Sequence, residues 1–152
     1  TLCNVYAMIG GSGSTLALVV LLLVLGKKGS AERSIGKVSI IPGLFGINEP
    51  VTFGLPIVLN PIMFIPFVFV PVINAIIGYF ATSWGLVNHL VVLNSGVEPI
   101  FVNAWVLGAF TLSPVILCIV LFILDLVLYY PFVKLQIKQN TLEAQNEGAA
   151  VE

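Results

Sequence analysis

Asn48, Glu49 and Pro50 form the part of this sequence best suited to chemistry. Glu49 is the only charged residue between Lys37 and Glu98, and it lies in an apolar, proline-rich stretch. A carboxylate in such a stretch is costly, and in membrane proteins it usually faces the bundle interior or an aqueous cavity. Carboxylate oxygens accept hydrogen bonds, and the Asn48 amide both donates and accepts them. The pair is therefore suited to neutral polyhydroxyl ligands.

A structural role for Glu49 is the alternative to ligand binding. Pro50 suits the first turn of a helix, so Glu49 would cap a helix that starts at this point. The two roles are compatible, because the N-terminus of a helix beside a cavity also holds polar ligands in transporters. We therefore predict that Glu49 and Asn48 bind substrate.

Three further residues are candidates for the same site. Gly11 and Ser12 lie in a run of small residues at 10–14, which either lets membrane helices approach closely or lines a ligand cavity. Glu98, followed by Pro99, repeats the Glu-Pro pair of the first site. It is either the tip of a second hairpin or an acidic residue at the membrane interface.

Four other residues with reactive side chains have ordinary roles as their first interpretation. His89 stands alone near the predicted outer end of a helix, where an interfacial position is expected. Asp125 interrupts an apolar segment, where it either bonds a neighbouring helix or carries a transported proton. Cys3 and Cys118 are expected to pack as small apolar side chains, because two isolated cysteines make neither a disulfide framework nor a metal motif. The sequence predicts no metal and no cofactor.

The composition places the chain in a lipid bilayer. Its 152 residues are 59% hydrophobic and 9% charged, whereas soluble domains have about 25% charged residues. A soluble domain of this size exposes too much surface to hide so many apolar side chains. The net charge of −1 gives no basis for binding nucleic acid. We expect an all-α membrane protein.

The basic residues set the expected topology. All six fall in two clusters, which are Lys27, Lys28, Arg33 and Lys37, and Lys134 and Lys138. Short loops rich in Lys and Arg stay cytoplasmic, so the chain between the clusters crosses the membrane an even number of times. Three apolar segments fit this rule and the length of a span, about 20 residues; these are residues 5–26, 60–83 and 112–132.

Two apolar stretches remain after these spans are placed. Residues 38–59 hold several prolines and glycines, which exclude one straight helix. Irregular backbone at membrane depth has to lie against protein or a water-filled cavity, so we predict a re-entrant hairpin with Glu49 near its tip. Residues 85–111 are predicted to form a second re-entrant or interfacial segment. The polar residues 135–152 are predicted to form a disordered cytoplasmic tail.

Several ordered motifs resemble one family of membrane transporters. They are the glycine–serine run from Gly10, the block 42–61 that contains Asn48-Glu49-Pro50, Ile65-Pro66-Phe67, and Tyr129-Tyr130-Pro131-Phe132. Together they resemble the lactose/cellobiose family of phosphotransferase-system permeases, in the C-terminal part of the membrane subunit, enzyme IIC. The resemblance implies that residues 1–134 belong to the substrate-binding region of a larger permease, of which this sequence is an incomplete piece.

The resemblance also implies a function, a site and partners. The protein would belong to a multi-pass permease of the bacterial cell (inner) membrane that takes up a disaccharide, cellobiose-, lactose- or chitobiose-like, and couples uptake to phosphorylation. Glu49 matches the glutamate that binds sugar in this family, and a histidine working beside it would lie upstream of Thr1. The phosphoryl donor is a cysteine on cytoplasmic enzyme IIB, so whether this chain itself counts as an enzyme stays open. The full-length permease is expected to be a homodimer with a cytoplasmic C-terminus.

Two other function classes remain open from the residues. An ion-coupled secondary sugar transporter would carry a proton on Glu49 or Asp125, and its uptake would collapse with the proton gradient. A non-catalytic membrane scaffold would give each of these residues its structural role, and variants at Glu49 would then behave independently of sugar.

Overall fold

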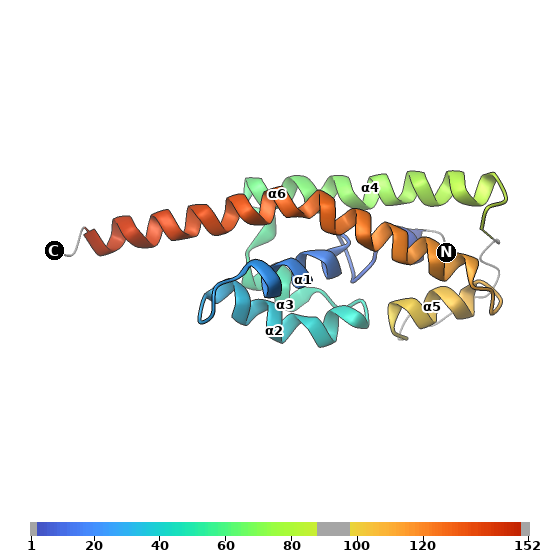
Figure 1. Ribbon diagram of the computed structural model, residues 1–152, viewed down its shortest axis with the longest axis horizontal. Helices are drawn as coiled ribbons and strands as arrows, with labels where there is room; N and C mark the ends of the chain where they lie inside the picture. Colours follow the sequence, from blue (N-terminus) through green and yellow to red (C-terminus); the bar gives the residue numbers. More distant parts are fainter. Residues whose placement is uncertain (1–2, 88–97, 150–152) are drawn as a thin grey trace.

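A computed structural model describes residues 3–87 and 98–149, and every regular element in these ranges is helical. The elements in chain order are a π-helical turn η1 (Cys3–Ala7), α1 (Thr15–Leu25), α2 (Ala31–Leu44), α3 (Glu49–Gly54), a 3-10 turn η2 (Ile57–Leu59), α4 (Pro61–Ser83), α5 (Ile100–Leu107) and α6 (Ser113–Ala149). The long helices α4 and α6 pack against each other, and α1, α2 and α3 lie together beneath them (Figure 1). The prediction of an all-α protein is confirmed for the described part of the chain.

Two helices are long and apolar enough to cross a membrane, α4 and α6. The start of α4 is fixed by Asn60, whose side-chain oxygen accepts hydrogen bonds from the backbone N–H groups of Ile62 and Met63, as expected for a helix N-cap. Pro61 follows at the first helical position, where no N–H is needed. Two of the three segments predicted to span, 60–83 and 112–132, are therefore continuous helices of sufficient length.

The third predicted span, residues 5–26, is wrong as a continuous helix. Helix α1 has only 11 residues, about 16 Å of rise, which is about half the hydrocarbon thickness. A turn of small residues separates it from η1, and Gly10, Gly11 and Gly13 there have φ of 85°, 96° and 83°. Such left-handed conformations do not continue a right-handed helix. The hydropathy of residues 5–26 does not reveal this break at the glycines.

Over the stretch 38–59, where a re-entrant hairpin is predicted, the chain forms two helices joined by a short turn. Helix α2 begins earlier than predicted, at Ala31, because the Ser30 side chain accepts a hydrogen bond from the backbone N–H of Arg33 and caps it. It ends at Leu44, and α3 then begins at Glu49 and packs against it. Glu49 therefore follows the turn directly, close to the predicted tip. The depth of this hairpin in a bilayer stays a prediction.

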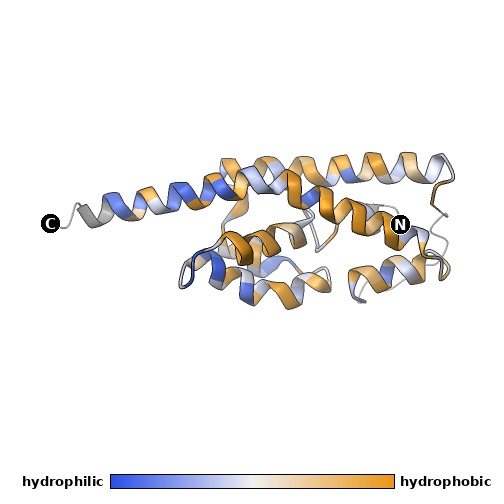
Figure 2. Cartoon of the chain, in the orientation of Figure 1, coloured by the Kyte–Doolittle hydropathy of each residue, from blue (hydrophilic) through white to orange (hydrophobic). Residues whose placement is uncertain are grey.

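The structure differs from the prediction of a disordered tail over residues 135–152. Helix α6 continues to Ala149, and its second half projects beyond the other elements and is largely hydrophilic (Figures 1 and 2). The start of this second half is held by hydrogen bonds. Asn60 donates one to Gln136, which in turn donates one to Asn140. Of the predicted segment 85–111, α5 is described, whereas His89 lies outside the described residues.

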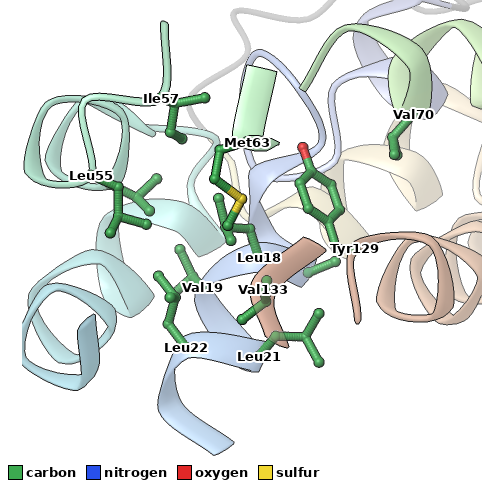
Figure 3. Close-up of a cluster of buried hydrophobic side chains, with 12 residues drawn as sticks. Leu18, Val19, Leu21, Leu22, Leu55, Ile57, Met63, Val70, Tyr129 and Val133 are labelled. Atoms are coloured by element: carbon green, nitrogen blue, oxygen red, sulfur yellow. The ribbon is translucent and has the colours of Figure 1, made fainter. Parts of the chain in front are cut away.

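The core lies where α1 meets α6 and the segment from α3 to the start of α4. Leu18, Leu22, Met63 and Tyr129 are completely buried there. Figure 3 shows the α1 side chains pointing toward Met63 from one side and toward Tyr129 and Val133 of α6 from the other. Burying such side chains contributes about 1.5–3 kcal/mol each. This core packs α1 against α6 and the start of α4.

Glu32 links α2 to the far half of α6. Its carboxylate is nearly buried and accepts a hydrogen bond of 2.6 Å from the Asn140 amide. Burial raises the pKa of Glu32, but hydrogen bonds from Asn140, from its own backbone N–H and from Ser30 outweigh burial and hold it below the ordinary value of 4.5. A lowered native pKa stabilises the fold above the unfolded-state pKa, and this stabilisation is lost as the pH falls through the native pKa.

Replacing Asn140 with alanine is expected to destabilise the protein by about 1.5–3 kcal/mol at neutral pH, because a hydrogen bond to a charged group is lost. The difference from the unmodified protein should begin to shrink as the pH falls below about 4.5, and it should be lost once the pH has passed the lowered native pKa of Glu32. Thermal melting between pH 7 and pH 3 measures it, with the exposed neighbour Gln139→Ala as control. A difference that stays constant over this range would contradict the assignment.

Candidate functional site

Glu49 is the first residue of α3 and its side chain is exposed. The first turn of α3 is closed by two hydrogen bonds, because the Asn48 carbonyl accepts from both the N–H and the Oγ1 of Thr52, at 2.9 Å and 2.8 Å. Pro50 occupies the first turn of α3. Pro50 is thus confirmed as a helix-start residue. Glu49 is the first residue of the helix and not its cap, because Asn48 occupies the N-cap position, without a side-chain capping hydrogen bond.

Asn48 connects this helix start to the glycine turn. Its Nδ2 donates a hydrogen bond of 2.7 Å to the carbonyl oxygen of Ser12, 36 positions earlier in the chain. Gly11 lies equally close, since a Cβ built on it would be 2.7 Å from the Gly46 carbonyl oxygen and 2.8 Å from the Asn48 Cγ. Only glycine fits this approach. Three of the predicted site residues, Gly11, Ser12 and Asn48, are therefore in contact, and Glu49 follows Asn48 directly in the chain.

A pocket of about 250 Å³ adjoins this region. It is lined by Gly11 and Met8 from the N-terminal segment, Phe45 and Gly46 from the turn before α3, and Glu98, Ile100 and Asn103 at the start of α5. The structure thus brings Glu98 to the same pocket as Gly11, although these residues are far apart in the sequence. Asn103 was not singled out from the sequence, where nothing distinguishes an asparagine in a short apolar helix.

A second polar cluster, in the packed interior, was only half visible in the sequence. Asp125 is fully buried and accepts hydrogen bonds from the Asn74 amide, at 2.9 Å and 3.1 Å to its two oxygens. The predicted bond from Asp125 to a neighbouring helix is confirmed. Asn74 itself was missed, and its only signal was a lone asparagine midway along an apolar span. Cys118 is buried among apolar side chains, as predicted.

The comparisons with known proteins agree on one family. The family model described as "Phosphotransferase system, EIIC" matches residues 2–71. The cellobiose-specific EIIC component of the Lactococcus lactis phosphotransferase system is 40% identical over 140 residues, which cover 92% of this chain and 28% of that protein. The lichenan permease IIC component of Bacillus subtilis is 34% identical, over 92% of this chain and 31% of that protein. Over most of its length, the chain is therefore similar to EIIC components of the phosphotransferase system.

A solved EIIC structure has the same fold. The crystal structure of the transporter ChbC, the IIC component of an N,N'-diacetylchitobiose-specific phosphotransferase system, superimposes with a TM-score of 0.88 and 43% sequence identity. The match covers 93% of this chain and 33% of ChbC. The EIIC resemblance predicted from the motifs is therefore confirmed, and the chain spans about a quarter to a third of the length of these relatives. EIIC components are membrane proteins, which agrees with the predominantly hydrophobic residues of α4 and of the first half of α6 (Figure 2).

Proposed function

We propose that this chain forms part of the sugar site of a bacterial phosphotransferase-system permease. The permease takes up a disaccharide of the cellobiose, lactose or chitobiose class and couples its uptake to phosphorylation. Glu49 accepts hydrogen bonds from sugar hydroxyls, and Asn48 positions the start of α3. The observation that carries the proposal is the joining of Glu49-Asn48 to the glycine turn beside a polar-lined pocket.

The chemistry of the pocket supports a neutral, hydroxyl-rich ligand. Its wall combines a carboxylate from Glu98, an amide from Asn103 and backbone at Gly11 and Gly46 with the apolar side chains of Met8 and Phe45. Sites for small molecules commonly pair apolar walls with a few fixed polar groups. Sugars offer both surfaces, because their C–H faces are apolar and their hydroxyls donate and accept hydrogen bonds.

The size of the pocket indicates that this chain supplies one wall of the site. Small-molecule sites usually measure about 300–1,000 Å³, whereas this pocket holds about 250 Å³. The relatives are three to four times longer than the matched segment. We propose that other parts of the permease close the site over the sugar, and that the α2–α3 hairpin is re-entrant, with Glu49 facing the resulting cavity.

The two basic clusters support one cytoplasmic face. Lys27 at the α1–α2 corner and Asn140 on the second half of α6 line one pocket of about 420 Å³. The first basic cluster therefore lies beside the extension of α6 that follows Lys134 and Lys138. We propose that this end, with the C-terminus, is cytoplasmic and faces the phosphoryl donor, enzyme IIB. The Staphylococcus haemolyticus relative is named a lactose-specific EIICB component, which fits a IIC unit working with a IIB unit. A homodimer of the full permease stays a prediction.

Replacing Glu49 with glutamine in the permease that carries this chain is expected to weaken sugar binding at least about tenfold, because hydrogen bonds to a charged acceptor contribute about 1.5–3 kcal/mol. Calorimetric titration with cellobiose, lactose and N,N'-diacetylchitobiose measures this. Glu143→Gln is the matched control, since Glu143 is an exposed glutamate on the far half of α6. Unchanged affinity in a folded Glu49→Gln protein would overturn the proposed site.

A further inference from the structure

A buried polar cluster ties the glycine turn to both long helices. Asn74 of α4 donates hydrogen bonds to Asp125 of α6 and, at 3.2 Å, to the Oγ of Ser14 in the turn. All three residues are completely buried. From the same face of α6, the Tyr129 hydroxyl donates a hydrogen bond to the carbonyl oxygen of Gly13. Two adjacent residues of the turn are therefore held by polar groups of α4 and α6.

Ser14 needs this support because its backbone is strained. Its φ is 53°, in the left-handed region that non-glycine residues rarely adopt. Its Oγ donates a 2.9 Å hydrogen bond to the carbonyl of Ala7 while accepting the one from Asn74. The next residue, Thr15, donates from its Oγ1 to the Gly10 carbonyl. Such strain persists only where the surrounding contacts hold the conformation in place. The hydrogen bonds of Ser14 and Thr15 are the contacts that hold it here.

The fixed turn is also the partner of Asn48. Two residues before Ser14, the Ser12 carbonyl accepts the hydrogen bond from the Asn48 amide. The Ser12 carbonyl belongs to the peptide that joins Ser12 to Gly13, and Gly13 is followed directly by Ser14. A turn released at Ser14 is therefore expected to hold this acceptor less firmly for Asn48. Hydrogen bonds thus lead from Asp125 through Asn74 to Ser14, the backbone of the turn leads from Ser14 to Ser12, and a further hydrogen bond leads from Ser12 to Asn48, which is adjacent to Glu49.

We propose that Asp125 and Asn74 are positioning residues for the sugar site: through Ser14 they fix the glycine turn in the conformation that holds Asn48, and so Glu49, in place. This inference rests on the proposed sugar site. It assigns a role in that site to Asp125 and Asn74, neither of which lines the pocket. The cost of a buried carboxylate is offset here by the Asn74 amide.

Asparagine at position 125 provides a conservative variant. Within the described residues, the Asn74 Oδ1 is buried without a hydrogen-bond partner. In Asp125→Asn, the new amide has a donor for this oxygen and keeps an acceptor for the Asn74 amide. A reciprocal amide pair would hold Asn74 in place. Asp125→Asn should therefore retain the turn, whereas Asn74→Ala should release it.

Hydrogen exchange of the permease that carries this chain, read by mass spectrometry, tests the proposal. In Asn74→Ala, amides of residues 8–16 and 45–52 should exchange about tenfold faster, and disaccharide affinity should fall about tenfold, for one lost hydrogen-bonded link. Ser14→Ala should do the same while leaving the Asp125–Asn74 pair intact, and Asp125→Asn should stay near the unmodified protein. Thr82→Ala is the matched control, because among the described residues this buried α4 hydroxyl bonds only the Gly78 carbonyl of its own helix.

Each outcome decides the proposal. Exchange in residues 8–16 no faster than in Thr82→Ala would overturn it. Faster exchange with unchanged sugar affinity, where Glu49→Gln does weaken binding, would also overturn the positioning role. If Glu49→Gln has no effect on affinity, the proposed sugar site fails, and the exchange rates alone still decide whether Asp125 and Asn74 fix the turn.

Discussion

Gly11→Ala is expected to abolish measurable sugar binding by the permease and to lower its melting temperature. The added Cβ would lie 2.7 Å from the Gly46 carbonyl oxygen and 2.8–2.9 Å from the Asn48 side chain. These atoms belong to the backbone and to a residue already bonded to Ser12, so the methyl group forces the turn and the start of α3 apart. Overpacking of this kind costs about 1–3 kcal/mol, and the φ of 96° adds about 1–2 kcal/mol for alanine.

Gly46→Ala separates the two contributions. Gly46 also has a left-handed backbone, with φ of 78°, but no described atom lies within 4 Å of its Cβ position. The substitution therefore carries the backbone cost without the steric one. The melting temperature should therefore fall much less than in Gly11→Ala. Equal losses in the two variants would show that the approach of Gly11 to Asn48 has no part in the site.

Gly13→Ala is expected to destabilise the protein by about 2–5 kcal/mol, from the left-handed backbone and from overlap. Its φ is 83°, and a Cβ would overlap the ring of Phe67 on α4. The same residue accepts the hydrogen bond from the Tyr129 hydroxyl, so a shift of the turn also weakens its attachment to α6. Thermal unfolding of the purified permease measures the loss.

A second substitution at Phe67 checks the cause. Phe67→Leu shortens the side chain that meets the new methyl group, so Gly13→Ala/Phe67→Leu should be more stable than the sum of the single losses by about 1–3 kcal/mol. Gly29→Ala is the control for backbone conformation, because Gly29 has φ of 87° and no described atom near its Cβ position. Strictly additive losses would contradict a steric contact between Gly13 and Phe67.

The sequence predicted the elements whose signals are local. The start of α4 follows from Asn60-Pro61, an N-cap and a first-turn proline. The start of α3 at Glu49-Pro50 follows from the same rule, and it placed the predicted substrate-binding pair beside a turn. Both signals act over a few residues of backbone, so they do not depend on contacts with distant parts of the chain.

Features that depend on distant partners were not predictable in this way. The run 10–14 is small and apolar enough to pass as part of a span, and only its contacts with Gly46, Phe67 and Asn74 show why it turns. The helical continuation past Gln136 depends on Asn60 and Glu32, because the local sequence is merely polar. The pairing of Asn74 with Asp125 joins residues 51 positions apart, for which a single sequence carries no spacing rule.

Helix α6 is longer than the hydrocarbon layer of a bilayer is thick. Its 37 residues rise about 55 Å, while the hydrocarbon layer is only about 30 Å thick. With the apolar half in lipid, about 25 Å of helix stands clear of the hydrocarbon, farther than the headgroup layer reaches. Asn140 lies on this part and is bonded to Glu32 of α2, so the corner between α1 and α2 is raised with it. A protein approaching from the water would contact the second half of α6 and the corner between α1 and α2 before it contacts the lipid headgroups.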